Sequence, residues 1–433
     1  MQGDNILVTG GTGFLGDELI RRLCTDTTAH LWVLSRSSKA GSASDRILQR
    51  LDRRFHQRVT IVEGDLGQPL LGLEHTANQT AAATFQRLID CCDEVFHNAA
   101  ELSFRSDAEG RERIIDVNVG GTARLLDLVK RCRQPLKAFN FTSTAYVHGA
   151  WPADRVFRED DQPTVWRNAY EQSKWQAETL VAESGLPFRI FRPSIIVTEP
   201  EATVLSYDGM YLIGDALAKG RDLYRRRFPD GHLSLEIMAA TDSAQNFVLR
   251  RDVADMVMKL RAAPAAMNRR FHVVTASNTR LEHMFDALAH VLGFSYTFVD
   301  KVTTRNPMSH LFKRTVLPAY EGYLFNACPV LDQSNVRSVL GEDYVNQTMT
   351  RIDAGWMKTL FRDYFARRGA GFATAPAAPV PGAPDQTVAA LVEDWGNVVR
   401  VQLVGEYRAA NRRTHLWRVR VPARTTNRPD QAE

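Results

Sequence analysis

The sequence has few cysteines, little net charge and no long apolar runs, and each of these shortages excludes a class of protein. Five cysteines occur among 433 residues, without CxxC spacing, so the sequence predicts neither a disulfide framework nor a metal site. No run approaches the roughly 18 consecutive apolar residues that cross a bilayer, and the N-terminus lacks the basic lead of a secretory signal. We therefore expect a cytoplasmic protein without a transmembrane segment.

The net charge is small and unevenly distributed. Lys plus Arg number 54 and Asp plus Glu number 50, which gives a formal charge of +4, too little to indicate nucleic-acid binding. Residues 388–433 contain eight arginines, no lysine and five acidic residues, so this tail holds +3 of the total. We expect the basic tail to help recruit an acidic partner.

Short β-branched runs alternate with longer amphipathic stretches along the first half of the chain. This alternation is typical of βαβ units, which build a parallel sheet with helices on both faces. The sequence therefore predicts an α/β fold with a Rossmann-type, doubly wound parallel sheet. We expect strands at residues 5–9, 30–35, 59–63, 94–98, 137–142 and 187–192. We expect helices near residues 14–24, 78–92, 111–133 and 168–184.

The alternation loosens after about residue 195, which suggests a division into segments. Helix-compatible stretches follow at residues 207–219, 251–262, 279–292, 332–340 and 353–368. We expect a Rossmann domain over residues 1–195, to which the chain returns near 245–265, and a smaller, mostly helical C-terminal substrate cap over residues 196–368. An Ala/Pro-rich linker over 369–387 would precede the tail, in which residues 398–404 and 415–421 could pair as a β-hairpin.

The strongest local motif is a glycine-rich turn between the first expected strand and helix. Gly10 would make the tight turn, Gly13 would let the backbone approach a pyrophosphate, and Gly16 would let the helix pack closely on the sheet. Free N–H groups at the start of the helix would face the phosphates. The motif predicts dinucleotide binding. The other cofactor-binding residues that we expect in this turn are Thr12, Phe14 and Leu15.

The ends of the second and third strands indicate which dinucleotide binds. Arg36 stands where NAD-binding proteins carry a carboxylate for the ribose 2′-hydroxyl, and a cation there accepts the 2′-phosphate of NADP. Arg46 could complete the phosphate pocket, with plain surface charge as the alternative. Asp65, followed by Leu66, could accept a hydrogen bond from the adenine amino group or could cap its own loop. We therefore predict NADPH as the cofactor.

A tyrosine, a lysine and a hydroxyl form a candidate catalytic set. Tyr170 and Lys174 are four residues apart on an expected helix and so share one face. A neighbouring ammonium group favours the phenolate, which would lower the pKa of the tyrosine and suit it to acid–base work. Hydroxyls at residues 142–144 end the fifth strand at the same rim of the sheet as the glycine turn. One of them could bind a substrate carbonyl oxygen while Tyr170 protonates it.

These residues resemble the extended short-chain dehydrogenase/reductase family over roughly residues 4–265. The resemblance implies that Thr144, five residues before Gly149, is the catalytic hydroxyl, that Tyr170 is the proton donor, and that Lys174 holds the nicotinamide ribose. It also implies a cofactor channel with Pro193 and Ser194 at the nicotinamide end. The residues that would line this channel are Asn98, Ala99 and Ala100. We interpret the nearby His97 and His148 as structural.

Three segments are most similar to the thioester-reductase and fatty acyl-CoA reductase branch, also described as male-sterility-like. They are residues 95–100, 143–149 and 170–178. The resemblance implies NADPH-dependent reduction of an acyl thioester to an aldehyde or alcohol, with the acyl group delivered on coenzyme A or on a carrier protein. Two alternatives remain: an epimerase or dehydrogenase acting on a nucleotide sugar or a bulky alcohol or ketone, and a non-catalytic nucleotide-sensing scaffold, against which the complete catalytic set argues.

Overall fold

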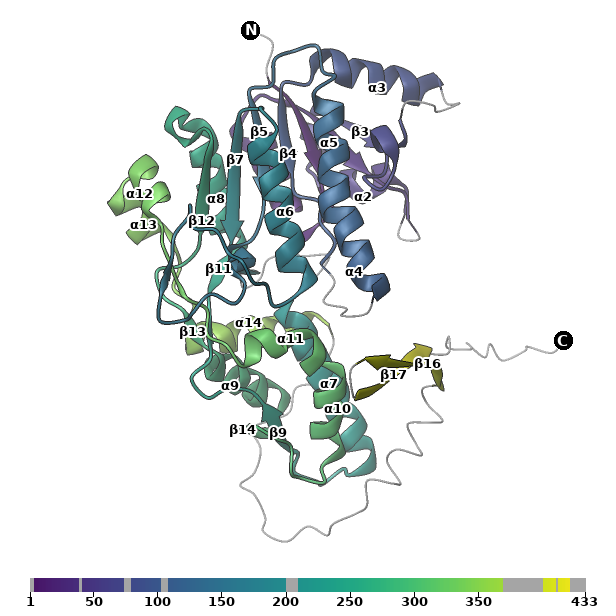
Figure 1. Ribbon diagram of the computed structural model, residues 1–433, viewed down its shortest axis with the longest axis vertical. Coiled ribbons are helices and arrows are strands. Elements are labelled where there is room, and N and C mark those ends of the chain that lie inside the picture. The colour runs from purple at the N-terminus through teal and green to yellow at the C-terminus, as the bar shows by residue number, and fades with distance from the viewer. Residues whose placement is uncertain are drawn as a thin grey trace, which may run out of the picture.

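A computed structural model describes residues 4–38, 41–73, 79–102, 108–199 and 209–368, and the backbone of residues 400–409 and 412–420. Its centre is a seven-stranded sheet in the order β12-β7-β5-β4-β1-β2-β3, in which all neighbouring strands are parallel (Figure 1). The strands are β1 (Asn5–Thr9), β2 (His30–Ser35), β3 (Val59–Glu63), β4 (Glu94–His97), β5 (Ala138–Thr142), β7 (Phe188–Pro193) and β12 (Arg269–Val273). The predicted doubly wound α/β fold is confirmed.

The six expected strands are all present, each within one residue of its predicted bounds. They are rich in apolar residues because both faces of the sheet are covered, and Ile6, Leu7 and Val8 of β1 are completely buried. The seventh strand, β12, was not expected. It pairs with β7 at the edge of the sheet, so the chain returns to the sheet over a longer stretch than residues 245–265.

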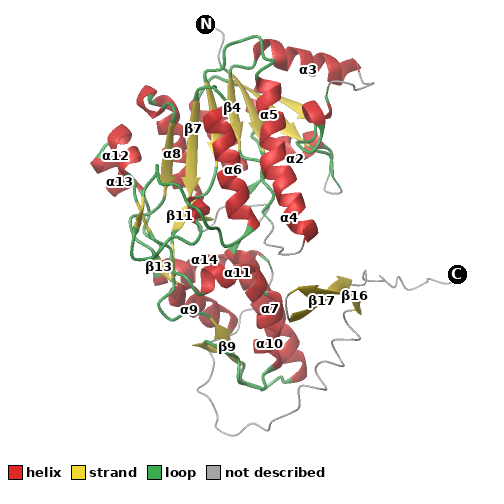
Figure 2. Ribbon diagram, in the orientation of Figure 1, coloured by secondary structure: helices red, strands yellow, loops and turns green. Residues whose placement is uncertain are grey.

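Helices cover both faces of this sheet (Figure 2). One face packs against α1 (Phe14–Asp26), α2 (Ala43–Leu48) and α8 (Arg250–Ala262). The other face packs against α3 (Gln79–Cys91), α5 (Gly121–Val129) and α6 (Ala169–Glu183). The single helix expected over residues 111–133 is divided, because a π-helical turn at Asp116–Gly120 separates α4 (Ala108–Ile115) from α5.

A second core lies beyond the carboxyl ends of the strands, below the sheet in Figure 1. Its helices are α7 (Met210–Arg227), α9 (Leu281–Leu292), α10 (Pro307–Thr315), α11 (Leu317–Leu324) and α14 (Ala354–Arg367). Buried Tyr211, Phe285 and Phe361 fill its centre, and β9 (Ser234–Met238) pairs with β14 (Ser295–Val299) beside them. The short strands β8 (Ile195–Val197) and β11 (Phe247–Leu249) connect this part to the sheet.

Two short helices from the expected cap range pack elsewhere. Val336 of α12 (Ser334–Leu340) and Val345 of α13 (Glu342–Thr348) join the core formed by β1, α1 and α8. The division at residues 195 and 368 therefore stays a prediction, and the expected linker at 369–387 lies outside the described residues. In the tail, β16 (Arg400–Ala409) and β17 (Arg412–Arg420) pair antiparallel, in the region where the sequence suggested a hairpin of residues 398–404 and 415–421.

None of the helices in the described part of the chain combines the length and the apolar character that a membrane span needs.

Candidate active site

A cavity of about 590 Å³ opens at the carboxyl ends of the strands, between the sheet and the second core. The strand order reverses between β1 and β4, and ligands of open α/β sheets bind at such a switch point. Every residue that the sequence analysis proposed for the site lines this cavity. The chain therefore brings the candidate residues together from eight separate segments of the sequence, although their individual roles stay predictions.

The glycine turn leaves no room for side chains at two positions. Gly10 has a φ of 71°, and a Cβ atom there would lie 2.5 Å from the amide nitrogen of Ala99. A Cβ atom on Gly16 would lie 2.1 Å from the carbonyl oxygen of Gly10. Helix α1 begins after Gly13 without a side-chain cap, and the residues of its first turn, Phe14, Leu15 and Gly16, line the cavity. This cradle fits the pyrophosphate of a dinucleotide.

Two guanidinium groups lie beside this turn. Arg46 donates to the carbonyl oxygen of Arg36 at 2.7 Å and to the Thr12 hydroxyl at 3.3 Å. Arg36 is 63% exposed and lies 3.3 Å from a carboxylate oxygen of Asp65. The other oxygen of Asp65 accepts from the amide of Gly67 at 2.9 Å. Asp65 therefore caps its own loop, and the pair of arginines presents positive charge at this end of the cavity.

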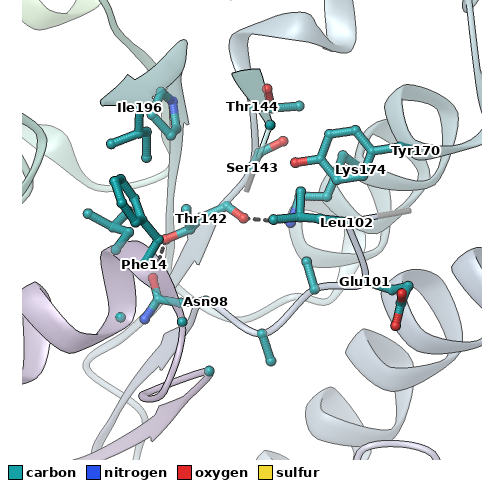
Figure 3. A pocket seen from close by; sticks show the side chains of 18 of the residues that line it. Phe14, Asn98, Glu101, Leu102, Thr142, Ser143, Thr144, Tyr170, Lys174 and Ile196 are labelled. Carbon is teal, nitrogen blue, oxygen red and sulfur yellow. Dashed lines mark hydrogen bonds between the residues drawn. The ribbon is translucent and has the colours of Figure 1, made fainter. Parts of the chain in front are cut away.

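The candidate catalytic residues lie on two adjoining elements (Figure 3). Tyr170 is in the first turn of α6, and the Asn168 side chain caps this helix by accepting from the amide of Glu171 at 3.0 Å. Thr144 follows β5 and caps the short 3₁₀ turn Ala145–His148. Its hydroxyl oxygen accepts a hydrogen bond from the backbone amide of Tyr146 at 3.2 Å. The Thr144 and Tyr170 side chains both line the cavity.

Burial sets the protonation of both Tyr170 and Lys174. It raises the pKa of Tyr170 above its usual value, the Glu171 carboxylate raises it further, and the hydrogen bond with Thr144 opposes them. Burial lowers the pKa of Lys174 to about 7. The Lys174 Nζ donates to the carbonyl oxygen of Thr142 at 2.6 Å. The expected lowering of the tyrosine pKa is therefore absent from this structure, and Tyr170 keeps its proton at neutral pH.

Three buried polar atoms of the cavity wall lack a hydrogen-bond partner among the described residues. They are Asn98 Nδ2, Ser143 Oγ and Ser194 Oγ. The Asn98 side chain is oriented by the Thr142 hydroxyl, which donates to its Oδ1 (Figure 3). Buried polar groups normally have partners, so these atoms fit a polar ligand in the cavity. Asn98 and Ser194 were expected here, whereas Ser143 was set aside in favour of Thr144.

Asn118 in the π-helical turn was not proposed as a site residue. Its Oδ1 accepts from the amide of Glu101 at 2.7 Å and its Nδ2 donates to the Ser173 hydroxyl at 2.9 Å, so it connects the cavity wall to α6. In the sequence, the asparagine and the glycines of residues 118–121 are the feature that could have indicated a role for Asn118 in the site. His97 is hydrogen-bonded through both ring nitrogens, and burial lowers its pKa to about 3, as a structural role requires.

The parallel sheet, the glycine turn and the Tyr170–Lys174 pair define the class of the protein. It is an NAD(P)-dependent oxidoreductase with the short-chain dehydrogenase/reductase fold. A family model described as Male sterility protein, an NAD-binding model, matches residues 8–242, which is more than half of the chain. The chain belongs to this family. The predicted resemblance is confirmed, and so is the expectation of a nicotinamide cofactor.

Curated relatives and a solved structure agree with this assignment. The chain is 33% identical over 211 residues to an isonitrile lipopeptide synthase of Streptomyces coeruleorubidus, covering 46% of this chain and 14% of that protein. It is 27% identical over 246 residues to the fatty acyl-CoA reductase wat of Drosophila melanogaster, covering 48% and 46%. The chain thus spans less than half the length of these relatives. The terminal R domain from the myxalamid PKS-NRPS biosynthetic pathway shares the fold, with 24% identity, a TM-score of 0.66, and 87% and 93% of the two chains covered.

Proposed function

We propose that this chain is an NADPH-dependent reductase of an acyl thioester, which it converts to an aldehyde or alcohol. The observation that carries the proposal is the place of the Tyr170 and Thr144 hydroxyls, because they lie in one cavity with the glycine cradle and with an apolar chamber. The relatives support the thioester, since they include a fatty acyl-CoA reductase and a nonribosomal peptide synthetase. A solved structure that shares the fold is a thiolation-reductase di-domain from an archaeal non-ribosomal peptide synthetase.

The apolar chamber supports an acyl group as substrate. Apolar side chains from α7, α9, α11 and the β8–β11 pair form its wall; they are Ile195, Met210, Ile213, Phe247, Leu281, Met284 and Leu324. Among the described residues, no charged side chain after residue 195 lines the cavity. An uncharged hydrocarbon chain gains free energy by leaving water for such a wall, whereas a charged substrate group would lack a partner there.

The side chains near Tyr170 suit the polar part of the reaction. When bound, NADPH supplies a hydride to the carbonyl carbon. The Tyr170 hydroxyl donates its proton to the carbonyl oxygen as negative charge develops there, and the Thr144 hydroxyl holds the same oxygen. Lys174 becomes protonated near neutral pH and balances the charge on Tyr170 after the proton has left. Collapse of the resulting hemithioacetal releases a thiol and an aldehyde.

Tyr170→Phe tests this function. The variant should lose about 10²- to 10⁴-fold in kcat, the usual contribution of a positioned proton donor, and should keep its affinity for NADPH. The assay follows NADPH oxidation with acyl-coenzyme A and acyl-carrier substrates. Tyr224→Phe is a matched control, because Tyr224 is a partly buried tyrosine of α7 outside the cavity. Near wild-type activity in Tyr170→Phe would contradict the mechanism, and failure to turn over any thioester would contradict the substrate class.

A further inference from the structure

A buried ion pair lies at the start of α6, next to the proposed proton donor. The side chains of Arg167 and Glu171 are 8% and 0% exposed, and their closest nitrogen and oxygen atoms are 2.7 Å apart. Glu171 also accepts from the backbone amide of Arg167 at 3.0 Å. A third group completes the cluster, because the hydroxyl of Tyr323 on α11 donates to the same carboxylate at 2.9 Å. We name Arg167, Glu171 and Tyr323 the α6–α11 clasp.

Aromatic rings enclose the guanidinium of the clasp. The Arg167 guanidinium lies 4.6 Å from the centre of the Tyr323 ring and 5.4 Å from that of Tyr146. The two rings meet edge to face with their centres 5.4 Å apart. Contacts between a cation and the face of an aromatic ring are stabilising, most of all where water is excluded. The clasp is therefore held by stacking as well as by charge.

Further hydrogen bonds tie the clasp to the cavity wall. Asn168, the cap of α6, donates from Nδ2 to the Tyr323 hydroxyl at 2.9 Å. Tyr146 donates to Gln245 Oε1 at 3.0 Å, and Gln245 Nε2 donates to the carbonyl oxygen of Tyr323 at 2.7 Å. Tyr146, Gln245 and Tyr323 all line the cavity. The polar contacts thus join α6, the turn after β5 and α11 around one end of the site.

Each joined element carries a part of the proposed reaction. Glu171 follows Tyr170 directly, Tyr146 stands two residues after Thr144, and Tyr323 precedes Leu324 of the apolar chamber. A shift of α11 would therefore move the chamber wall and the first turn of α6 together. Such shifts matter because a misplacement of about 1 Å at a reacting group can cost on the order of 100-fold in rate.

We propose that Glu171 and Tyr323 are positioning residues, which lock α11 onto the first turn of α6 and so set the Tyr170 hydroxyl relative to both Thr144 and the acyl chamber. This inference rests on the proposed function, in which Tyr170 donates the proton. Glu171 touches neither the substrate chamber nor the reacting atoms. It acts through Tyr170, which precedes it in the chain, and through Tyr323, which donates to its carboxylate.

Tyr323→Phe is the first test, because it removes one hydroxyl and keeps the ring that stacks on Arg167. We expect kcat/KM for an acyl thioester to fall by on the order of tenfold, while the Kd for NADPH stays unchanged. Tyr364→Phe is the matched control. Tyr364 is a buried tyrosine of α14 whose hydroxyl bonds to Asp215 at 2.8 Å and to Arg368 at 2.6 Å, and it does not line the cavity. The Tyr364→Phe variant should lower the free energy of unfolding about as much as Tyr323→Phe does, and it should leave kcat/KM unchanged.

Glu171→Gln gives a second readout that a purely structural role would not move. The groups that act on the pKa of Tyr170 are Glu171 on α6, which raises it, and Thr144 after β5, which lowers it. Loss of the carboxylate charge should therefore lower this pKa, so the loss of kcat that follows ionisation of Tyr170, at pH values above the titration of Lys174, should begin at lower pH. The side-chain amide oxygen of the introduced Gln can still accept the hydrogen bond from the Tyr323 hydroxyl, so the packing around residue 171 should change little.

The outcomes separate this inference from the proposed function. If Tyr170→Phe retains activity, the proposed function fails first, whatever the clasp does. If Tyr170→Phe is inactive while Tyr323→Phe keeps the wild-type kcat/KM, the clasp is structural only and the inference is wrong, even where Glu171→Gln does not fold. An unchanged pH profile in folded Glu171→Gln would also overturn it.

Discussion

Arg36 and Arg46 are the residues on which the choice between the two nicotinamide cofactors depends. Hydrogen bonds to charged groups contribute about 1.5–3 kcal/mol, which corresponds to about 10- to 100-fold in Kd. Arg36→Ala should therefore weaken NADPH binding by about that factor and should leave NADH binding nearly unchanged. Fluorescence titration with both cofactors measures this difference.

The control for Arg36 is Arg54→Ala, which removes another exposed arginine, paired with Asp52 and outside the cavity. This variant should bind both cofactors like the wild type. Equal losses for NADPH and NADH in Arg36→Ala would refute the assignment of Arg36 to the 2′-phosphate.

Lys174 gives a pH dependence to folding. Its pKa is about 7 in the folded chain and about 10.4 in an unfolded one. Below pH 7 both states carry the charge, and folding bears the full cost of burying it. Between these values only the unfolded chain binds the proton, so the free energy of unfolding should rise with pH. Urea denaturation without added cofactor should show this rise in the wild type and not in Lys174→Met.

Lys259→Met is the matched control for this measurement, since Lys259 is an exposed lysine of α8. Its curve of unfolding free energy against pH should run parallel to that of the wild type. Parallel curves for the wild type and Lys174→Met would contradict the lowered pKa of Lys174.

At the residue scale, the sequence predicted which residues line the cavity wherever local spacing carries the signal. The glycine turn and the pair Tyr170 and Lys174 are of this kind. The partner of Glu171 was not predictable, because Tyr323 lies 152 residues away and no local pattern connects the two. The raised pKa of Tyr170 was missed for a related reason, since burial depends on packing and not on the nearest lysine.

At the scale of elements, burial explains which predictions succeeded. Strands covered on both faces are rich in apolar residues and were found within one residue of their bounds. The edge strand β12 begins with Arg269 and Arg270, which pair with side chains of neighbouring elements, so its sequence lacks an apolar run. The division between α4 and α5 was not predicted, because the π-helical turn at Asp116–Gly120 continues the helix and contains no proline that would mark a break.

Helix α9 offers a test of the acyl chamber. Met284 is buried and lines the cavity, so Met284→Phe should shorten the space for an acyl chain. Each methylene that no longer fits costs about 0.8 kcal/mol, or roughly fourfold in kcat/KM. Measured over a series of acyl chain lengths, kcat/KM should fall for the longer members only.

Met357→Phe is the control for this substitution. Met357 of α14 is fully buried in the same core but does not line the cavity, so the change adds similar volume without entering the chamber. It should cost stability, by about 1–3 kcal/mol, and leave the chain-length preference unchanged. The same preference in Met284→Phe as in the wild type would place the acyl group elsewhere.

At the scale of the whole molecule, the chain combines a nearly neutral body with a basic tail. Residues 1–387 carry +1 and residues 388–433 carry +3. The side chains of the tail lie outside the described residues. A cluster of one sign attracts an oppositely charged partner and raises the rate of encounter, and salt weakens the effect. We therefore propose that the tail helps to recruit an acidic carrier protein that delivers the acyl group.

Deletion of residues 388–433 tests this proposal. KM for a carrier-bound acyl thioester should rise severalfold at low salt, because the long-range attraction is lost, while KM for the uncharged acyl-pantetheine should not change. A second variant with Arg412, Arg413, Arg418 and Arg420 replaced by Gln keeps the length of the tail and should behave like the deletion. If only the deletion raises KM, contact and not charge is responsible. If neither does, the tail plays no part in substrate delivery.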